Sequence, residues 1–250
     1  MRIKVINPNT TASVTRRIGL AASAVAAPGT EVLAVNPRQG PVSIEGHYDE
    51  AVSVIGLLEE IHAGEAEGID AYVIACFGDP GLLAAREIAS GPVLGIAEAA
   101  MHAASLIATG FSVVTTLGRT RIIAEHLVEA YGMGRFCRRV RATELAVLAL
   151  EDKGARQVIL EECRRALAED GSGAIVLGCA GMADLATALA HELGVPVIDG
   201  VVAAVKFAEA LVALRLGTSK HGDLAYPLAK PYAGDLDYLA PRYRGKASRD

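Results

Sequence analysis

Two cysteines, Cys76 and Cys179, stand at matching places in a pattern that the chain contains twice. Each follows a short apolar run rich in β-branched residues, and each is followed by a glycine-containing turn and a helical pattern. A buried strand that ends at such a turn points the turn residue outward, at the carboxyl edge of a parallel sheet. The repeat therefore predicts two thiols, one from each half of the chain, that face each other across a cleft.

Paired thiols on opposite sides of one carbon atom suit the inversion of a stereocentre that carries an acidic C–H bond. One thiolate removes the proton, and the other group, as a thiol, supplies a proton to the far face. Backbone N–H groups just after each cysteine can stabilise the enolate oxygen that forms. These groups belong to Phe77, Gly78, Ala180 and Gly181. We also expect the dipole of the helix that follows each cysteine to favour its thiolate form.

The other two cysteines, Cys137 and Cys163, lack such a context. One lies in a short predicted strand, and the other lies in a predicted helix that is rich in Glu and Arg. A lone cysteine is most often a small, buried, apolar residue. We therefore interpret both as core residues without a catalytic role.

Strand and helix patterns alternate along most of the chain, which predicts an α/β fold with parallel sheets and right-handed crossovers. The predicted strands cover residues 2–6, 31–35, 69–75, 93–96, 111–115, 136–140, 174–177 and 195–198. The predicted helices cover residues 12–27, 49–67, 80–89, 98–108, 121–131, 157–169, 184–193 and 202–216. Thr10 and Thr11 are expected to cap the first helix, and residues 141–153 are ambiguous by pattern.

The order of the elements repeats, so we expect two similar lobes, each with a parallel sheet flanked by helices, related by a pseudo-twofold axis. Residues 1–97, completed by a C-terminal helix and tail over 201–250, form the first predicted lobe, and residues 98–200 form the second. The active site is expected in the cleft between the lobes. Residues 36–47 form a long Pro- and Gly-containing loop, of the length that often binds ligands.

Composition excludes several classes of protein. Apolar residues make up 52% of the chain and charged residues 21%, which fits a compact globular protein. The net charge of −5 and the lack of a basic run argue against nucleic acid or an anionic membrane as a partner. The apolar stretch after Arg16 and Arg17 imitates a signal peptide, but it reads better as a helix, and no run has membrane-spanning length.

No motif for a metal or an organic cofactor is present. The cysteines and histidines lack the spacing of a zinc site, and sparse cysteines suggest free thiols in a reducing compartment, so we expect a cytoplasmic protein. Neither cysteine turn has an adjacent lysine, and neither a phosphate-binding loop nor a dinucleotide fingerprint occurs. We therefore expect no pyridoxal phosphate, no nucleotide and no metal.

Several segments carry a resemblance to a known family. The paired cysteines, residues 6–10 (INPNT) and residues 178–182 (GCAGM) resemble the aspartate/glutamate/hydantoin racemase superfamily. Its members are cofactor-independent enzymes with two α/β lobes and one catalytic cysteine from each. Residues 40–51, 75–81 and 219–227 resemble hydantoin racemases and, among these, the allantoin racemases of purine catabolism. The resemblance extends to about Pro227, and the tail beyond it matches no pattern.

The resemblance implies a set of substrate-binding residues beside Cys76 and Cys179. They are Asn9, Val42, Ser43, Phe77, Gly78, Thr115, Thr116, Ala180 and Gly181. All are neutral, which suits a flat, uncharged ring of amides better than a charged amino acid. Helix capping is an alternative role for Asn9, Thr115 and Thr116. We interpret Glu45 as a surface-loop residue and His47 as a helix-capping residue.

We therefore expect a racemase that inverts C5 of a 5-substituted hydantoin, and we expect this substrate to be allantoin. We also expect the protein to form a homo-oligomer. One alternative is a broad hydantoin racemase for 5-alkyl or 5-aryl substrates. Another is a decarboxylase or cis–trans isomerase of the superfamily. An enzyme of the arylmalonate decarboxylase type keeps only one thiol, so the presence of both thiols here argues against it. A thiol hydrolase would need a Cys–His pair, and a small-molecule binding protein would not need two matched thiols.

Overall fold

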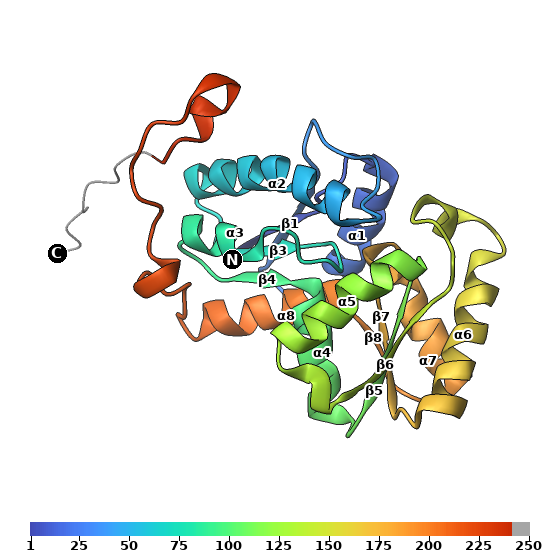
Figure 1. Ribbon diagram of the computed structural model, residues 1–250. Helices are drawn as coiled ribbons and strands as arrows, with labels where there is room; N and C mark the ends of the chain where they lie inside the picture. Colours follow the sequence, from blue (N-terminus) through green and yellow to red (C-terminus); the bar gives the residue numbers. More distant parts are fainter. Residues whose placement is uncertain (242–250) are drawn as a thin grey trace.

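A computed structural model describes residues 1–241, and two four-stranded parallel sheets form its centre (Figure 1). The first sheet has the strand order β2-β1-β3-β4, and the second has the order β6-β5-β7-β8. The strands are β1 (Arg2–Ile6), β2 (Glu31–Val35), β3 (Ala71–Ile74), β4 (Val93–Gly95), β5 (Phe111–Thr115), β6 (Cys137–Ala142), β7 (Ala174–Leu177) and β8 (Val197–Asp199).

The two sheets have the same topology. In each, the first strand of the lobe lies between the second and the third, and every pairing is parallel. The central strands are buried on both faces, which explains their continuous apolar sequences. The strands that precede Cys76 and Cys179, β3 and β7, therefore occupy equivalent positions. The predicted two-lobed α/β fold is confirmed.

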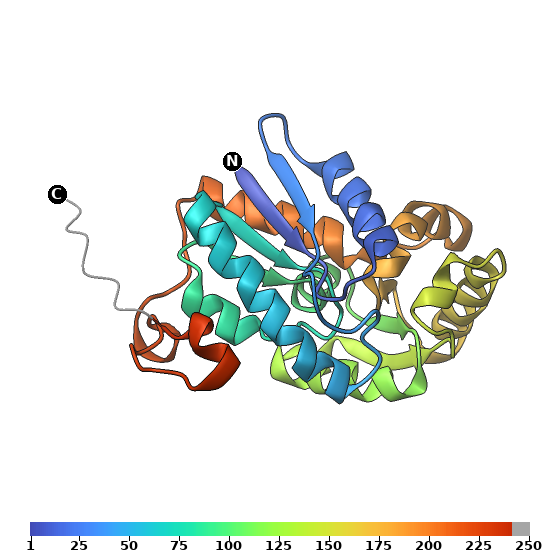
Figure 2. The same cartoon turned by 90° about the horizontal axis from the view of Figure 1, so that it is seen from above.

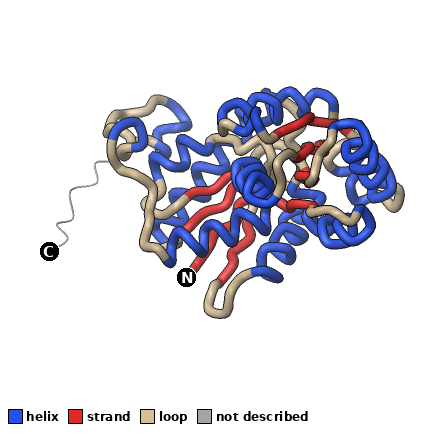
Figure 3. Tube along the Cα trace, turned by 90° about the horizontal axis from the view of Figure 1, so that it is seen from below, coloured by secondary structure: helices blue, strands red, loops and turns tan. Residues whose placement is uncertain are grey.

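Helices cover both faces of each sheet, so that the strands are enclosed between them (Figures 2 and 3). They are α1 (Ala12–Val25), α2 (His47–Glu67), α3 (Leu82–Ile88), α4 (Ile96–Ile107), α5 (Gly118–Ala130), α6 (Ala155–Asp170), α7 (Ala186–Leu193) and α8 (Gly200–Ala213). In the first lobe, α2 and α3 share one apolar cluster with the sheet, and α1 and α8 pack on the opposite side. None of these helices has both the length and the apolar character needed to cross a membrane.

Two helices join the lobes into one body. Helix α4 continues from the last strand of the first lobe and packs against β7 and β8 of the second. Helix α8 continues from the last strand of the second lobe and packs against β3 and β4 of the first. The two helices also pack against each other, and a single apolar core runs through both lobes. The division of the chain into lobes at residues 97/98 and 200/201 stays a prediction. Both boundaries lie close to the starts of the two exchanged helices, α4 and α8.

Several element boundaries differ from those predicted. Helices α2, α4, α5, α6 and α8 begin at least two residues earlier than their patterns suggest. The helix predicted over residues 184–193 begins two residues later, as α7, and a 3₁₀-helix, η3 (Ala180–Leu185), precedes it. The ambiguous residues 141–153 contain the end of β6 and a second 3₁₀-helix, η2 (Leu148–Glu151). The first turn of a helix is set by the path of the chain and its backbone partners, which apolar periodicity does not encode.

The described part of the tail lies along α2 and α3, to which no pattern assigned it (Figure 2). Its structured turns are the 3₁₀-helices η4 (Gly222–Leu224) and η5 (Gly234–Leu239). Thr218 Oγ1 donates to the carbonyl oxygen of Gly91 at 2.6 Å, and Lys220 Nζ donates to carbonyl oxygens of Arg86 and Glu87 at the end of α3. Tyr238 Oη donates to Glu59 of α2.

Candidate active site

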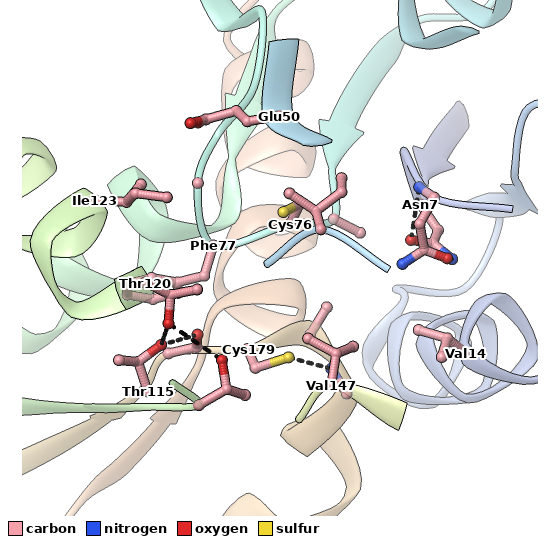
Figure 4. A pocket seen from close by; sticks show the side chains of 18 residues that line it. Asn7, Val14, Glu50, Cys76, Phe77, Thr115, Thr120, Ile123, Val147 and Cys179 are labelled. Carbon is pink, nitrogen blue, oxygen red and sulfur yellow. Dashed lines mark hydrogen bonds between the residues drawn. The ribbon is translucent and has the colours of Figure 1, made fainter. Parts of the chain in front are cut away.

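A cavity lies between the carboxyl edges of the two sheets, and both lobes contribute to its wall (Figure 4). Cys76 and Cys179 both line it. The other wall residues are Asn7, Asn9, Val14, Ile44, Glu50, Ala75, Phe77, Gly78, Thr115, Thr116, Thr120, Ile123, Val147, Gly178, Ala180 and Gly181. The two thiols that the repeat predicted to face one cleft are thus brought to one cavity.

Each thiol sits in the same kind of turn. The backbone N–H of Gly181 donates to Cys179 Sγ at 3.4 Å, and the N–H of Gly78 donates in the same way to Cys76. Side chains at either glycine would crowd the site. A Cβ on Gly78 would lie 2.9 Å from Glu50 Oε1, and one on Gly181 would lie 2.9 Å from Leu150 Cδ1. In each Cys-x-Gly turn the glycine therefore donates its N–H to the sulfur and leaves room that a side chain would fill.

Burial raises the pKa of both thiols, which corrects the prediction that helix dipoles lower it. The pKa of Cys179 is raised to about 11. Burial raises the pKa of Cys76 further, and the charges of Cys179, Asp79 and Glu50 add to this. The prediction was wrong because burial outweighs the hydrogen bond that each turn donates to its sulfur. In addition, neither thiol directly precedes a full α-helix: Gly81 is the N-cap of α3, and Cys179 is the N-cap of the six-residue η3.

Asp79 holds the Cys76 turn against the second lobe. Its backbone is left-handed, with φ of 44°, and its side chain is 5% exposed. The carboxylate accepts hydrogen bonds from the N–H groups of Ala97 (3.1 Å) and Glu98 (2.9 Å) and from Tyr131 Oη (2.7 Å). Burial raises the pKa of Asp79 to about 7. The sequence analysis assigned Asp79 no role, because its partners are 18 or more residues away.

Asn9 both lines the cavity and organises the start of α1. Its Oδ1 accepts the N–H of Thr11 at 2.9 Å and an N–H of Asn7 Nδ2 at 2.9 Å. Thr11 is at the N-cap position but its side chain does not cap the helix, because its hydroxyl donates to the carbonyl of Val42 at 2.6 Å. No side chain therefore caps α1, and Asn9 instead holds the N-cap residue, Thr11, in place.

Thr115 and Thr116 line the second-lobe side of the cavity. Thr115 Oγ1 donates to the carbonyl of Gly178 at 3.0 Å, which ties the end of β5 to the residue before Cys179. Thr116 Oγ1 lies 3.2 Å from Thr120 Oγ1. Neither threonine is a helix N-cap, since Leu117 holds that position for α5. Thr120, which the sequence analysis missed, is a wall residue one helical turn away from Thr116.

The long loop contributes a different residue from those predicted. Val42 and Ser43 are not among the wall residues, and Val42 is 60% exposed, whereas Ile44 lines the cavity. Glu45 is not a free surface residue, because its Oε1 accepts the N–H of Val147 from the second lobe at 2.8 Å. His47 is the first residue of α2 and does not cap it, since Gly46 is the N-cap.

Glu50 is the only charged side chain among the wall residues, which qualifies the expectation of a neutral wall. It lies in the first turn of α2, and His47 Nδ1 is 3.6 Å from its Oε2. Burial raises the pKa of Glu50, and His47 opposes this. The sequence places Glu50 one turn after the long loop, but no local pattern indicates which side of α2 faces the cavity.

The two remaining cysteines lie away from the cavity wall. Cys163 is fully buried in the cluster formed by α6 and the second sheet, and Cys137 is half-buried in β6. Over residues 1–241, no group of three or more His, Cys, Asp or Glu side chains is arranged to hold a metal ion.

Comparison with known proteins places the chain. A family model described as Asp/Glu/Hydantoin racemase matches residues 3–208. The chain is 55% identical over 236 residues to a hydantoin racemase of Rhizobium meliloti, covering 94% of this chain and 98% of the relative. It is 51% identical over 239 residues to one of Pseudomonas sp. (strain NS671), covering 95% and 96%. The structure of an allantoin racemase from Klebsiella pneumoniae matches with a TM-score of 0.95 and 63% identity, covering 97% of this chain and 100% of that one.

These similarities span nearly the whole chain, including both cysteine turns and the strands that lead to them. They agree with what the cavity offers: two matched thiols at equivalent positions of two similar lobes. The chain is accordingly a racemase, and it belongs to the Asp/Glu/hydantoin racemase family.

Proposed function

We propose that this protein racemises C5 of 5-substituted hydantoins without a cofactor, and that allantoin is its substrate. The observation that carries the proposal is the placement of Cys76 and Cys179 at equivalent turns on opposite sides of one cavity. A 5-substituted hydantoin has one C–H at C5, next to a ring carbonyl. Removing that proton gives an enolate, and C5 of the enolate can take up a proton on either face.

In the proposed reaction, one cysteine is a thiolate and the other a thiol. The thiolate takes the C5 proton, and the electron pair of the broken C–H bond moves into the enolate. The thiol on the other face then gives its proton to C5, so the two sulfurs have exchanged protonation states and the substrate has inverted. Phe77 and Ala180 directly follow the two cysteines, and the N–H groups that donate to the sulfurs belong to Gly78 and Gly181 instead. We assign the N–H groups of Phe77 and Ala180 the role of donating hydrogen bonds to the enolate oxygen.

We assign substrate binding to the neutral residues of the cavity wall. Asn9, Thr115 and Thr116 supply amide and hydroxyl groups for the ring amides, and Ile44 from the long loop takes the place that the resemblance gave to Val42 and Ser43. Phe77, Gly78, Ala180 and Gly181 complete this set. Neutral donors and acceptors match an uncharged ring, because a charged substrate would need opposite charges in compensation.

Polarimetry of single enantiomers tests the proposal. Pure (R)- and (S)-allantoin and (S)-5-benzylhydantoin are each incubated with the protein and, as controls, alone. We expect loss of optical rotation with allantoin well above the enzyme-free rate, and slower loss with the benzyl compound. Faster turnover of 5-benzylhydantoin would favour a broad hydantoin racemase instead, and the absence of any enzymatic racemisation would reject the substrate class.

A cytoplasmic location and assembly into a homo-oligomer complete the proposal. The location follows from free thiols, which persist in a reducing compartment. Size-exclusion chromatography with light scattering tests the assembly, and a mass equal to one chain would reject it.

A further inference from the structure

Arg17 lies behind the turn that carries Cys179. It belongs to α1 of the first lobe, and α1 packs against η3, which begins directly after Cys179. Arg17 Nη2 lies 3.9 Å from where a Cβ on Gly181 would be, and the N–H of Gly181 is the donor to Cys179 Sγ. A cation from one lobe therefore stands beside the turn that carries the thiol of the other.

The guanidinium of Arg17 is only partly paired. Nη2 forms an ion pair with Glu151 Oε1 at 3.1 Å, on a carboxylate that Ser13 Oγ also contacts at 3.0 Å. Within residues 1–241, however, Nε and Nη2 are buried and neither makes a hydrogen bond. Buried donors normally have acceptors, so a guanidinium in this state favours additional negative charge nearby.

The charges around the two thiols differ in sign. The positive charge of Arg17 lowers the pKa of Cys179, and Glu45 opposes it. The charges acting on Cys76 are those of Cys179, Asp79 and Glu50, and all of them raise its pKa. A cation thus assists one thiol, whereas the other is surrounded by acids.

Other charged groups on the elements packed against η3 are already engaged or exposed. On α7, Glu192 pairs with Arg156 (2.6 Å) and Arg164 (3.8 Å), and His191 is exposed. On α8, Lys206 pairs with Glu209 at 2.7 Å. The carboxylate of Asp199 at the end of β8 accepts N–H groups of α8, and Asp184 of η3 and Arg16 of α1 are exposed.

We propose that Arg17 is a positioning residue that makes the two thiols unequal, so that Cys179 is the one that ionises first in the free protein. Glu151 holds the guanidinium from its outer side, and the turn of Gly181 lies on its inner side. The singly ionised form of the pair is then a Cys179 thiolate with a Cys76 thiol. Under the proposed function, on which this consequence rests, the free enzyme is ready for the enantiomer whose C5 hydrogen faces Cys179.

The order of ionisation is measured without a substrate, so its test is independent of the proposed function. The wild-type protein and the variants Arg17→Gln, Arg17→Lys and Arg16→Gln are alkylated with iodoacetamide between pH 7 and 11. Mass spectrometry of the Cys76 and Cys179 peptides gives a rate for each thiol at each pH. The midpoint of each thiol is the pH at which this rate, extrapolated along its slope, reaches half the plateau rate of the same peptide in the urea-unfolded protein. Circular dichroism confirms that each variant is folded over this range.

We expect the alkylation rate of wild-type Cys179 to reach its midpoint at a lower pH than that of Cys76. Arg17→Gln should move the Cys179 midpoint upward by half a pH unit or more, which lowers its rate at pH 8 by about threefold. Cys76 should be unaffected, Arg17→Lys should retain most of the wild-type midpoint, and Arg16→Gln, on the exposed side of α1, should match the wild type.

A lower midpoint for Cys76 than for Cys179 in the wild type would overturn the proposal, as would an unchanged Cys179 midpoint in folded Arg17→Gln. Should Arg17→Gln fail to fold, Glu45→Gln tests the same electrostatics with the opposite sign. It removes the opposing charge while leaving an oxygen for the N–H of Val147, so the Cys179 midpoint should fall. A midpoint that stays or rises in that variant would count against Arg17 as the determinant.

Discussion

Gly200 and Ile96 are the first residues of α8 and α4, and their backbones touch. A Cβ on Gly200 would lie 2.4 Å from the carbonyl oxygen of Ile96, closer than any real Cβ approaches a backbone atom. The two helices that exchange between the lobes therefore meet at their N-termini. This contact limits how closely the two helices, and the lobes that they join, can approach each other.

Gly200→Ala should accordingly weaken the junction of the lobes. Because the atom opposite is backbone rather than the end of a flexible side chain, the helices must move apart, at a cost of about 2 kcal/mol in unfolding free energy. Urea denaturation measures this loss. Gly173→Ala is the matched control, since its nearest atom would be 3.6 Å away, and a Gly200→Ala value equal to the control would contradict the contact.

Replacing either cavity thiol by serine should lower the racemisation rate by several orders of magnitude. A serine hydroxyl is a far weaker acid than a thiol and cannot serve as an ionised base near neutral pH. The remaining thiol can still exchange the C5 hydrogen of one enantiomer in D₂O without inverting it. NMR should therefore show exchange of opposite enantiomers by Cys76→Ser and Cys179→Ser.

Cys137→Ser provides the control for these variants, because Cys137 lies in β6 away from the cavity wall. Its turnover should stay within a few-fold of the wild type, and enzyme-free exchange is subtracted throughout. Racemisation at near wild-type rate by either cavity variant would exclude the two-thiol mechanism.

Asp79 should make stability depend on pH. Burial raises its pKa from 3.8 to about 7, so the folded protein binds this proton more tightly than the unfolded chain. Its contribution to the unfolding free energy is complete below pH 3.8 and falls, by up to about 1.4 kcal/mol per pH unit, as the pH rises to about 7.

Asp79→Asn cannot titrate, so its stability deficit relative to the wild type should shrink between pH 4.5 and 7.5. Urea denaturation at several pH values measures the difference. The variant Asp184→Asn, at an exposed site, controls for the loss of a carboxylate. Parallel curves for the wild type and Asp79→Asn would show that Asp79 has the same proton affinity in both states.

The enzymatic rate should rise with pH above neutrality. Burial raises the pKa of Cys179 to about 11, so at pH 7 most of the free protein holds the thiol rather than the thiolate. Below that pKa the thiolate fraction grows about tenfold per pH unit, and kcat/KM should follow it between pH 7 and 9. Polarimetry with subtraction of the enzyme-free rate measures the slope, and a flat profile would mean that the base is already ionised at pH 7.

Prolonged treatment with EDTA should leave the racemisation rate unchanged. Over residues 1–241, no cluster of His, Cys, Asp or Glu is arranged to hold a metal, and the proposed proton transfer uses only the two thiols. Polarimetry before and after dialysis against the chelator checks this. Activity that is lost on dialysis and restored by an added divalent cation would refute it.

Local patterns in the sequence were sufficient for the two-lobed fold and for the pairing of Cys76 with Cys179. Both depend on features that lie within a few residues of each other: an apolar strand, a turn glycine and a helix. The start of α8 is of the same kind, because its capping carboxylate, Asp199, is adjacent in the chain and accepts the N–H of Val201 at 2.9 Å.

Tertiary structure alone decided the features that join distant segments. The start of α4 is held by Asp79, whose partner Ala97 is 18 residues away, and Glu50 reaches the cavity only because of the way α2 packs. Burial, not the local helix dipole, dominates the acidity of the thiols, and burial is a property of the folded whole. The same holds for Arg17: its charge acts on Cys179 because the folded chain places α1 of one lobe against the turn of the other.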